Sequence, residues 1–179
     1  MRLGAYCIFE FMSTTSKIHT ALIKEVDHRL FEESLPRILE CLDKLTNAQV
    51  WWRPNESSNS IGNLVLHLCG NVGQWIGAGL GDLPDHRKRQ SEFDERRVIP
   101  KENLVSELLT TMMMAREIIA KVPEMELLQK RAVQTFEETG LSILIHVTEH
   151  FSYHTGQIAY ITKMLTDKAL GFYEGIPLE

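Results

Sequence analysis

Apolar residues recur every three or four positions along most of the chain, and this helical period constrains the fold more than any other feature. It runs through four segments, from Ile18 to Leu45, from Ser60 to about Leu80, between Pro100 and Pro123, and from Leu141 to Thr166. Stretches with the strict alternation of a half-buried strand are nearly absent. Amphipathic helices must bury their apolar faces against one another. The pattern therefore predicts an all-α fold with four main helices.

Proline, glycine and charged stretches divide these helices. Pro36 lies inside the first segment and predicts either a kink or a restart with Ser34 as the cap. The charged residues 81–100 predict a long irregular connection, and residues 124–139 fit either a short hairpin or a loop. Residues 1–16 lack a clean period and are expected to form a weakly ordered extension. The remaining residues, 17–179, are expected to form a single domain.

Composition excludes several classes of protein. The chain has 179 residues, with 19 Lys and Arg against 24 Asp and Glu, which gives a net charge of −5. This balance argues against a nucleic-acid-binding module, which needs a basic face. No uncharged apolar run reaches the ~18–20 residues of a membrane span, and the N-terminal segment is not expected to be a signal peptide. The three cysteines, Cys7, Cys41 and Cys69, are far apart in the sequence. They are expected to be reduced thiols in a cytoplasmic protein.

Two histidines interrupt the apolar stripe of the last predicted helix, where aliphatic side chains are expected. The stripe consists of Ile143, Val147, His150, His154, Ile158, Ile161 and Leu165. Side chains four residues apart on a helix lie about 5–6 Å from each other at Cβ, on one face. Two imidazoles at this spacing are able to bind one metal ion. From the spacing alone, a metal site and a pair of hydrogen-bonded core histidines are equally supported.

His67 supplies a third imidazole from a different helix. It lies beside the apolar stripe of the second helix, and it alone among the remaining histidines shares this inward character. Helix bundles build metal sites from side chains on facing helices. The sequence therefore predicts a metal site formed by His67, His150 and His154. Three protein ligands leave a position open for water or substrate, whereas four usually close a structural zinc site.

Neighbouring polar residues have less specific assignments. His146 lies one turn before His150, but each four-residue step drifts about 40° round the helix. We place His146 beside the metal site or in a substrate pocket, with a surface position as an equal alternative. Asn71 and Gln74 either contact a ligand or mark the margin of the bundle. The basic run 87–89 is normally solvated, but it would bind an anionic substrate if its loop folds over the site. Surface positions are expected for His19, His28 and His86.

The segments LVLHLCGN, around His67, and HVTEHFSYHTGQI, around His150 and His154, resemble the DinB/YfiT-like superfamily of metalloenzymes. That superfamily carries one histidine on the second bundle helix and an HxxxH pair on the last. The resemblance covers about residues 17–166 and points to an uncharacterised subgroup. It implies an antiparallel four-helix bundle, commonly a homodimer, with a divalent metal on three histidines, for which we expect zinc or nickel. Some members are similar to transferases or isomerases that use low-molecular-weight thiols.

Three functions are consistent with these residues. The first is a metal-dependent transferase for a small thiol, because a metal stabilises the nucleophilic thiolate. The second is a metal-dependent hydrolase with an activated water. A hydrolase needs a carboxylate base, and Glu149 lies ~100° round the helix from His150. The third is a non-catalytic bundle, in which the metal is structural or the histidines belong to the core.

Overall fold

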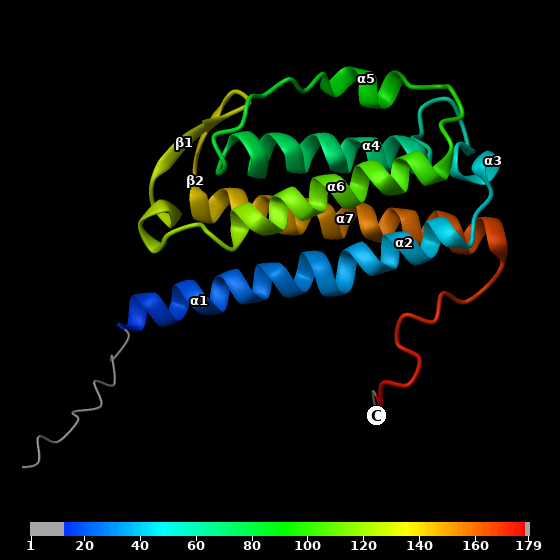
Figure 1. The fold of residues 1–179 in the computed structure, drawn as a ribbon. Helices are drawn as coiled ribbons and strands as arrows, with labels where there is room; N and C mark the ends of the chain where they lie inside the picture. Colours follow the sequence, from blue (N-terminus) through cyan, green and yellow to red (C-terminus); the bar gives the residue numbers. More distant parts are fainter. Residues whose placement is uncertain (1–12, 178–179) are drawn as a thin grey trace, which may run out of the picture.

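Four long helical segments lie side by side in the computed structural model, which describes residues 13–177 (Figure 1). Residues 1–12, most of the predicted extension, lie outside the described residues. The first helix begins earlier than expected, at Thr14, because the hydroxyl of Ser13 caps it. The long segments are formed by α1 (Thr14–Asp27) with η1 (His28–Ser34) and α2 (Leu35–Asp43), by α4 (Ile61–Val72) with η2 (Gly73–Ala78), by α6 (Lys101–Ile119), and by α7 (Gly140–Thr166).

The direction of these segments sets the topology. The segment from α1 to α2 and helix α7 run one way, while α4 and α6 both run the other way (Figure 1). Because α4 and α6 are parallel, the chain between them has to return along the whole length of the molecule. The crossover, residues 81–100, carries the short helix α5 (Arg89–Asp94) across the outer face of α4. The expectation of an irregular connection there is wrong for α5.

The predicted break at Pro36 takes the form of π-helical turns rather than a new helix cap. Residues His28–Ser34 continue α1 directly into α2, and Ser34 has helical backbone angles with no capping side-chain bond. Proline lacks a backbone N–H, so a locally wider helical turn accommodates it. The predicted start at Ser60 is confirmed, because Ser60 and Asn63 form a reciprocal capping box. A second capping box starts the short helix α3 (Asn47–Val50).

The expectation of an all-α fold holds for most of the described chain but is wrong at residues 130–139. After the 3-10 turn η3 (Glu124–Leu127), strands β1 (Lys130–Val133) and β2 (Phe136–Thr139) form an antiparallel hairpin. Gln134 lies in the tight turn with a φ of 54°, a left-handed conformation. The fold is therefore mostly helical with a small two-stranded sheet. The hairpin contacts η2 and α7.

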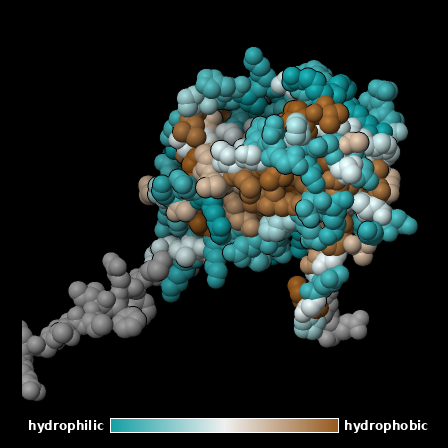
Figure 2. Space-filling model, turned by 45° about the vertical axis from the view of Figure 1, so that its right-hand side comes forward, coloured by the Kyte–Doolittle hydropathy of each residue, from teal (hydrophilic) through white to brown (hydrophobic). Residues whose placement is uncertain are grey.

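The core is a single apolar cluster to which all four helical segments contribute. Ile38, Leu68, Leu108 and Phe151, one from each segment, are completely buried or nearly so. Over the face in Figure 2, hydrophilic side chains border a band of apolar ones across the middle. No helix within residues 13–177 is both long and apolar enough to span a membrane.

Candidate metal centre

Three imidazoles from two helices converge in the interior. His67 projects from α4, and His150 and His154 project from successive turns of α7. The Nε2 atom of His150 lies 3.1 Å from Nε2 of His67 and 3.3 Å from Nε2 of His154. One ligand atom from each of the three residues lies within 4.8 Å of the others. Two nitrogens bound tetrahedrally to one ion at ~2.0–2.1 Å are about 3.3–3.4 Å apart. The observed separations are close to this spacing.

Hydrogen bonds on the far side of two rings direct their lone pairs into the cluster. His67 Nδ1 donates to Glu92 Oε2 at 2.8 Å, and His154 Nδ1 donates to Gln157 Oε1 at 2.7 Å. A neutral imidazole that donates from Nδ1 has an unprotonated Nε2. His150 Nε2 therefore faces two lone pairs, while its own buried Nδ1 has no hydrogen-bond partner. Three such nitrogens fit a cation placed between them better than they fit one another.

Glu92, the residue that fixes the His67 ring, comes from the crossover helix α5. It is 8% exposed and accepts hydrogen bonds from Arg87 Nε at 2.7 Å and from Arg87 Nη2 at 3.0 Å. Burial would raise the pKa of Glu92, but the hydrogen bonds from His67 and Arg87 outweigh it and hold this pKa below its usual range. An ionised carboxylate thus orients the imidazole, as is common for metal-binding histidines. No local sequence pattern marks Glu92, which lies in the charged stretch 81–100, as a site residue.

Gly70 makes room for Glu92 on the surface of α4. A Cβ atom at this position would overlap Glu92 Oε1 and would lie 2.8 Å from Glu92 Cδ and 2.9 Å from Arg87 Nε. The ion pair therefore rests directly on the helix backbone, one turn after His67. A side chain larger than hydrogen at position 70 would push α5 or its carboxylate away from His67.

The two imidazoles that α7 contributes to the cluster favour their neutral form. Burial, with smaller contributions from the neighbouring His154 and His67, lowers the pKa of His150 to about 3. Burial also lowers the pKa values of His154 and His146. Only the neutral imidazole binds a metal, so near pH 7 these rings need not lose a proton first.

A cavity of about 340 Å³ is lined by two of the three cluster histidines, His67 and His150. Its lining comes from α4, η2, the crossover, the hairpin and α7. His146 is part of the wall, and its ring stacks on Trp75 with centroids 3.8 Å apart and lies 5.5 Å from the ring of His150. The lining residues are His67, Asn71, Trp75, Arg87, Arg89, Gln134, Phe136, Glu138, His146 and His150. One side of the histidine cluster is thus open to this cavity, whose wall contains both polar and aromatic side chains.

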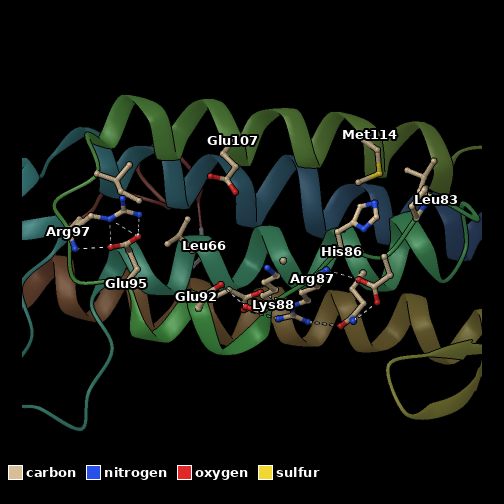
Figure 3. A pocket seen from close by; sticks show the side chains of 17 residues that line it. Leu66, Leu83, His86, Arg87, Lys88, Glu92, Glu95, Arg97, Glu107 and Met114 are labelled. Carbon is tan, nitrogen blue, oxygen red and sulfur yellow. Dashed lines mark hydrogen bonds and ion pairs between the residues drawn. The ribbon is translucent and has the colours of Figure 1, made fainter.

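A second cavity, of about 590 Å³, lies beneath the crossover and is bounded by α4 and α6 (Figure 3). Glu107 and Met114 of α6 border it, and the ion pair of Glu95 and Arg97 lies at one end. Burial raises the pKa of Glu107. Arg87 lines both cavities. The crossover, which carries Arg87 and Glu92, therefore lies between the second cavity and the histidine cluster.

The remaining predicted residues divide into those near the cluster and those away from it. Asn71 contacts His146, with Nδ2 and Nε2 separated by 3.4 Å, whereas Gln74 bonds to Asp85 and Arg87 on the crossover. The basic run does fold over the site, but Arg87 is already paired with Glu92. Of the three histidines expected at the surface, His86 is exposed and His28 faces Glu32, while His19 is half-buried against Val122.

Comparison with known proteins gives a family and a fold but no activity. The family model described as "Protein of unknown function (DUF1572)" matches residues 19–173. No curated protein matches the chain. A structure described as "Crystal structure of the conserved protein of locus from Enterococcus faecalis" is similar, with a TM-score of 0.63 and 18% identity. The similarity covers 88% of this chain and 99% of that chain, and it shows a shared fold.

Proposed function

We propose that this chain, which belongs to the DUF1572 family of proteins of unknown function, is a metal-dependent enzyme whose centre is held by His67, His150 and His154. The observation that carries the proposal is the convergence of three Nε2 atoms, at 3.1 and 3.3 Å across His150, beside an open cavity. Zinc and nickel are the ions we favour, since both accept imidazole ligands. A divalent ion on three histidines would have an open position and would lower the pKa of a thiol or water bound there.

Among metal-dependent reactions, we favour transfer of a small thiol. The wall of the cavity contains His146, whose ring lies 5.5 Å from that of His150 and whose imidazole would accept the thiol proton, although burial lowers its pKa. The sulfur would then form a bond to an electrophilic carbon of the second substrate, whose leaving group departs with the electron pair of the broken bond. Glu92 and Gln157 hold two of the imidazoles in place during this step.

Cobalt substitution tests both parts of this proposal. Cobalt-loaded protein should show an absorption spectrum that changes saturably on titration with cellular thiols, because a thiolate replaces water at the open position. The His67→Ala variant should lose this response, whereas His86→Ala, which alters an exposed histidine outside the cluster, should retain it. Failure of the native protein to bind cobalt would refute the metal centre. Binding of cobalt without any response to thiols would refute the thiol reaction.

A metal-dependent hydrolase is the second candidate, because a carboxylate does line the cavity. Glu138 on β2 belongs to the lining and accepts a hydrogen bond from Ser142 Oγ at 2.6 Å. A carboxylate in this place would serve as the base for an activated water. Glu149, the acidic residue nearest in sequence, is exposed and lies outside this cavity. Hydrolysis of esters or amides, lost in Glu138→Gln and unaffected in Glu149→Gln, would favour this function.

We further propose that the four helical segments form the four-helix bundle of the DinB/YfiT-like superfamily. Its support is the order of the histidines, one on α4 and an HxxxH pair on α7, together with the helix packing. From the same resemblance we infer a homodimer, which sedimentation would test. A cytoplasmic location is proposed from the free, buried thiols of Cys41 and Cys69. Fractionation of cells that express the tagged protein would test it.

A further inference from the structure

Three buried side-chain nitrogen or oxygen atoms lack a hydrogen-bond partner within residues 13–177, and all three belong to residues that line one cavity. They are Asn71 Oδ1, Trp75 Nε1 and His150 Nδ1. Asn71 is 4% exposed and Trp75 is 5% exposed. A buried polar group without a partner costs free energy, so native proteins rarely keep one without a reason. The two on α4 and η2, Asn71 Oδ1 and Trp75 Nε1, point to a ligand in the cavity that satisfies them.

The chemistry of two of these atoms is complementary. Trp75 Nε1 is only a donor, and the free amide oxygen of Asn71 is an acceptor. Both residues contact the ring of His146, Asn71 through a polar contact of 3.4 Å and Trp75 through stacking at 3.8 Å. They lie one helical turn apart, so their side chains share a face with about 5–6 Å between Cβ atoms. A group that donates from one atom and accepts at another matches this pair better than a single hydroxyl.

Charge in the cavity favours a neutral group at this place. The guanidinium of Arg87 is paired with Glu92, and Arg89 is exposed with its guanidinium over the ring of Phe93. Glu138 lies on the hairpin, where a hydrogen bond from Ser142 satisfies one carboxylate oxygen without cancelling its charge. The buried wall formed by Asn71 and Trp75 therefore carries no free charge of its own.

We propose that the cavity recognises a secondary carboxamide, whose N–H donates to Asn71 Oδ1 and whose carbonyl oxygen accepts from Trp75 Nε1. The amide belongs to a ligand whose other end reaches the metal centre, so this inference rests on the proposed function. The inference specifies the chemical group in the part of the ligand that lies away from the metal, and it applies to either of the reactions proposed above. The size of the cavity, about 340 Å³, admits a small molecule of this kind.

Four carboxylates with the same five-atom backbone test the assignment on cobalt-loaded protein. N-acetylglycine carries the amide, pentanoate carries only methylene and methyl groups, glutarate carries a second anion, and 4-aminobutanoate carries a cation. Each is titrated and its binding is followed by the visible spectrum of cobalt. One hydrogen bond to a neutral group is worth about fivefold in affinity, so N-acetylglycine should bind about 25-fold more tightly than pentanoate. It should also bind more tightly than the two charged probes.

Two variants locate the preference. Trp75→Phe keeps an aromatic ring beside His146 and deletes Nε1, while Asn71→Leu deletes the amide oxygen. Each should reduce the binding of N-acetylglycine about fivefold and leave pentanoate unchanged. Cobalt content, measured first, shows whether the centre of each variant is intact, and the comparison of four probes on the native protein does not depend on the variants.

The outcomes separate the two proposals. If cobalt binds and pentanoate or a charged probe binds as tightly as N-acetylglycine, the carboxamide assignment is wrong and the metal centre stands. Variants that bind cobalt and retain the full preference for N-acetylglycine would also overturn the assignment. If the native protein takes up no cobalt, the proposed function fails and the assignment fails with it.

Discussion

Replacing Gly70 with alanine should weaken metal binding, although Gly70 supplies no ligand atom. The added methyl group would overlap Glu92 Oε1 and would crowd Arg87 Nε at 2.9 Å. The carboxylate would have to leave its position 2.8 Å from His67 Nδ1. Loss of a carboxylate partner behind a metal-binding histidine typically lowers metal affinity 10- to 100-fold. This corresponds to about 1.4–2.7 kcal/mol of binding free energy.

Gly73→Ala is the matched control, because it places the same methyl group about one turn further along the same helical run. A Cβ atom at Gly73 meets nothing within 4 Å. Alanine is favoured over glycine inside a helix by up to about 1 kcal/mol. Gly73→Ala should therefore bind metal like the native protein and unfold at a slightly higher temperature. Thermal unfolding alone does not isolate the effect at Gly70, since the gain in helix propensity offsets part of the lost ion pair.

Competition between the protein and a chelator for zinc gives the affinity directly, and Glu92→Gln serves as a second perturbation. Glutamine keeps the shape of Glu92 and an oxygen acceptor but removes the negative charge, so its affinity should fall between those of the native protein and Gly70→Ala. Native affinity in Gly70→Ala would refute the role assigned to Glu92. An equal loss in Gly73→Ala would attribute the effect to the helix rather than to the carboxylate.

Two further predictions concern the histidines. His154→Ala should lose bound metal but remain helical and unfold cooperatively by circular dichroism, because the apolar core does not depend on the ion; loss of cooperative unfolding in metal-free protein would instead indicate a structural metal. The depressed pKa of His150, about 3, means that the unfolded state binds more protons than the native state between about pH 3 and 6.5. The metal-free protein should therefore lose stability to urea as the pH falls through this range, and His150→Gln should lose less; parallel pH profiles for the two proteins would contradict this reasoning.

The predicted metal site came from local spacing, which a helix preserves. His150 and His154 interrupt a stripe whose other members are apolar, and one helical turn brings them together wherever α7 lies. His67 was inferred by elimination and by its inward position, and the structure places it against both. The inward positions of these histidines follow from the helical period of the apolar residues, which recurs along most of the sequence.

Glu92 was missed because its role depends on topology. It lies in a charged stretch, 25 residues from His67, and nothing in the local pattern marks it as buried. Its position follows from the parallel course of α4 and α6, which carries the crossover back over His67. The role of Gly70 could not be predicted from the sequence either, because the need for a glycine arises only from the packing of Glu92 and Arg87 against α4.

The hairpin was left undecided for a different reason. Its tight turn contains Gln134 in a left-handed conformation, where glycine or asparagine would have been the recognisable signal. Its strands, KRAV and FEET, also lack the alternation of a half-buried strand. Both strands are nevertheless held in place by contacts with η2 and α7.

The distance along the chain between the converging histidines sets when the centre is completed during synthesis. His67 and His150 are 83 residues apart, and His154 lies in the last long helix. A ribosome adds about 5–20 residues per second, so His67 waits several seconds for its partners. Pairing across so long a loop also carries an entropic cost that only the docking of α7 offsets. The proposed metal centre would thus be completed only at the end of synthesis, after α7 has docked against α4, because a nascent chain that stops before α7 has His67 without His150 and His154.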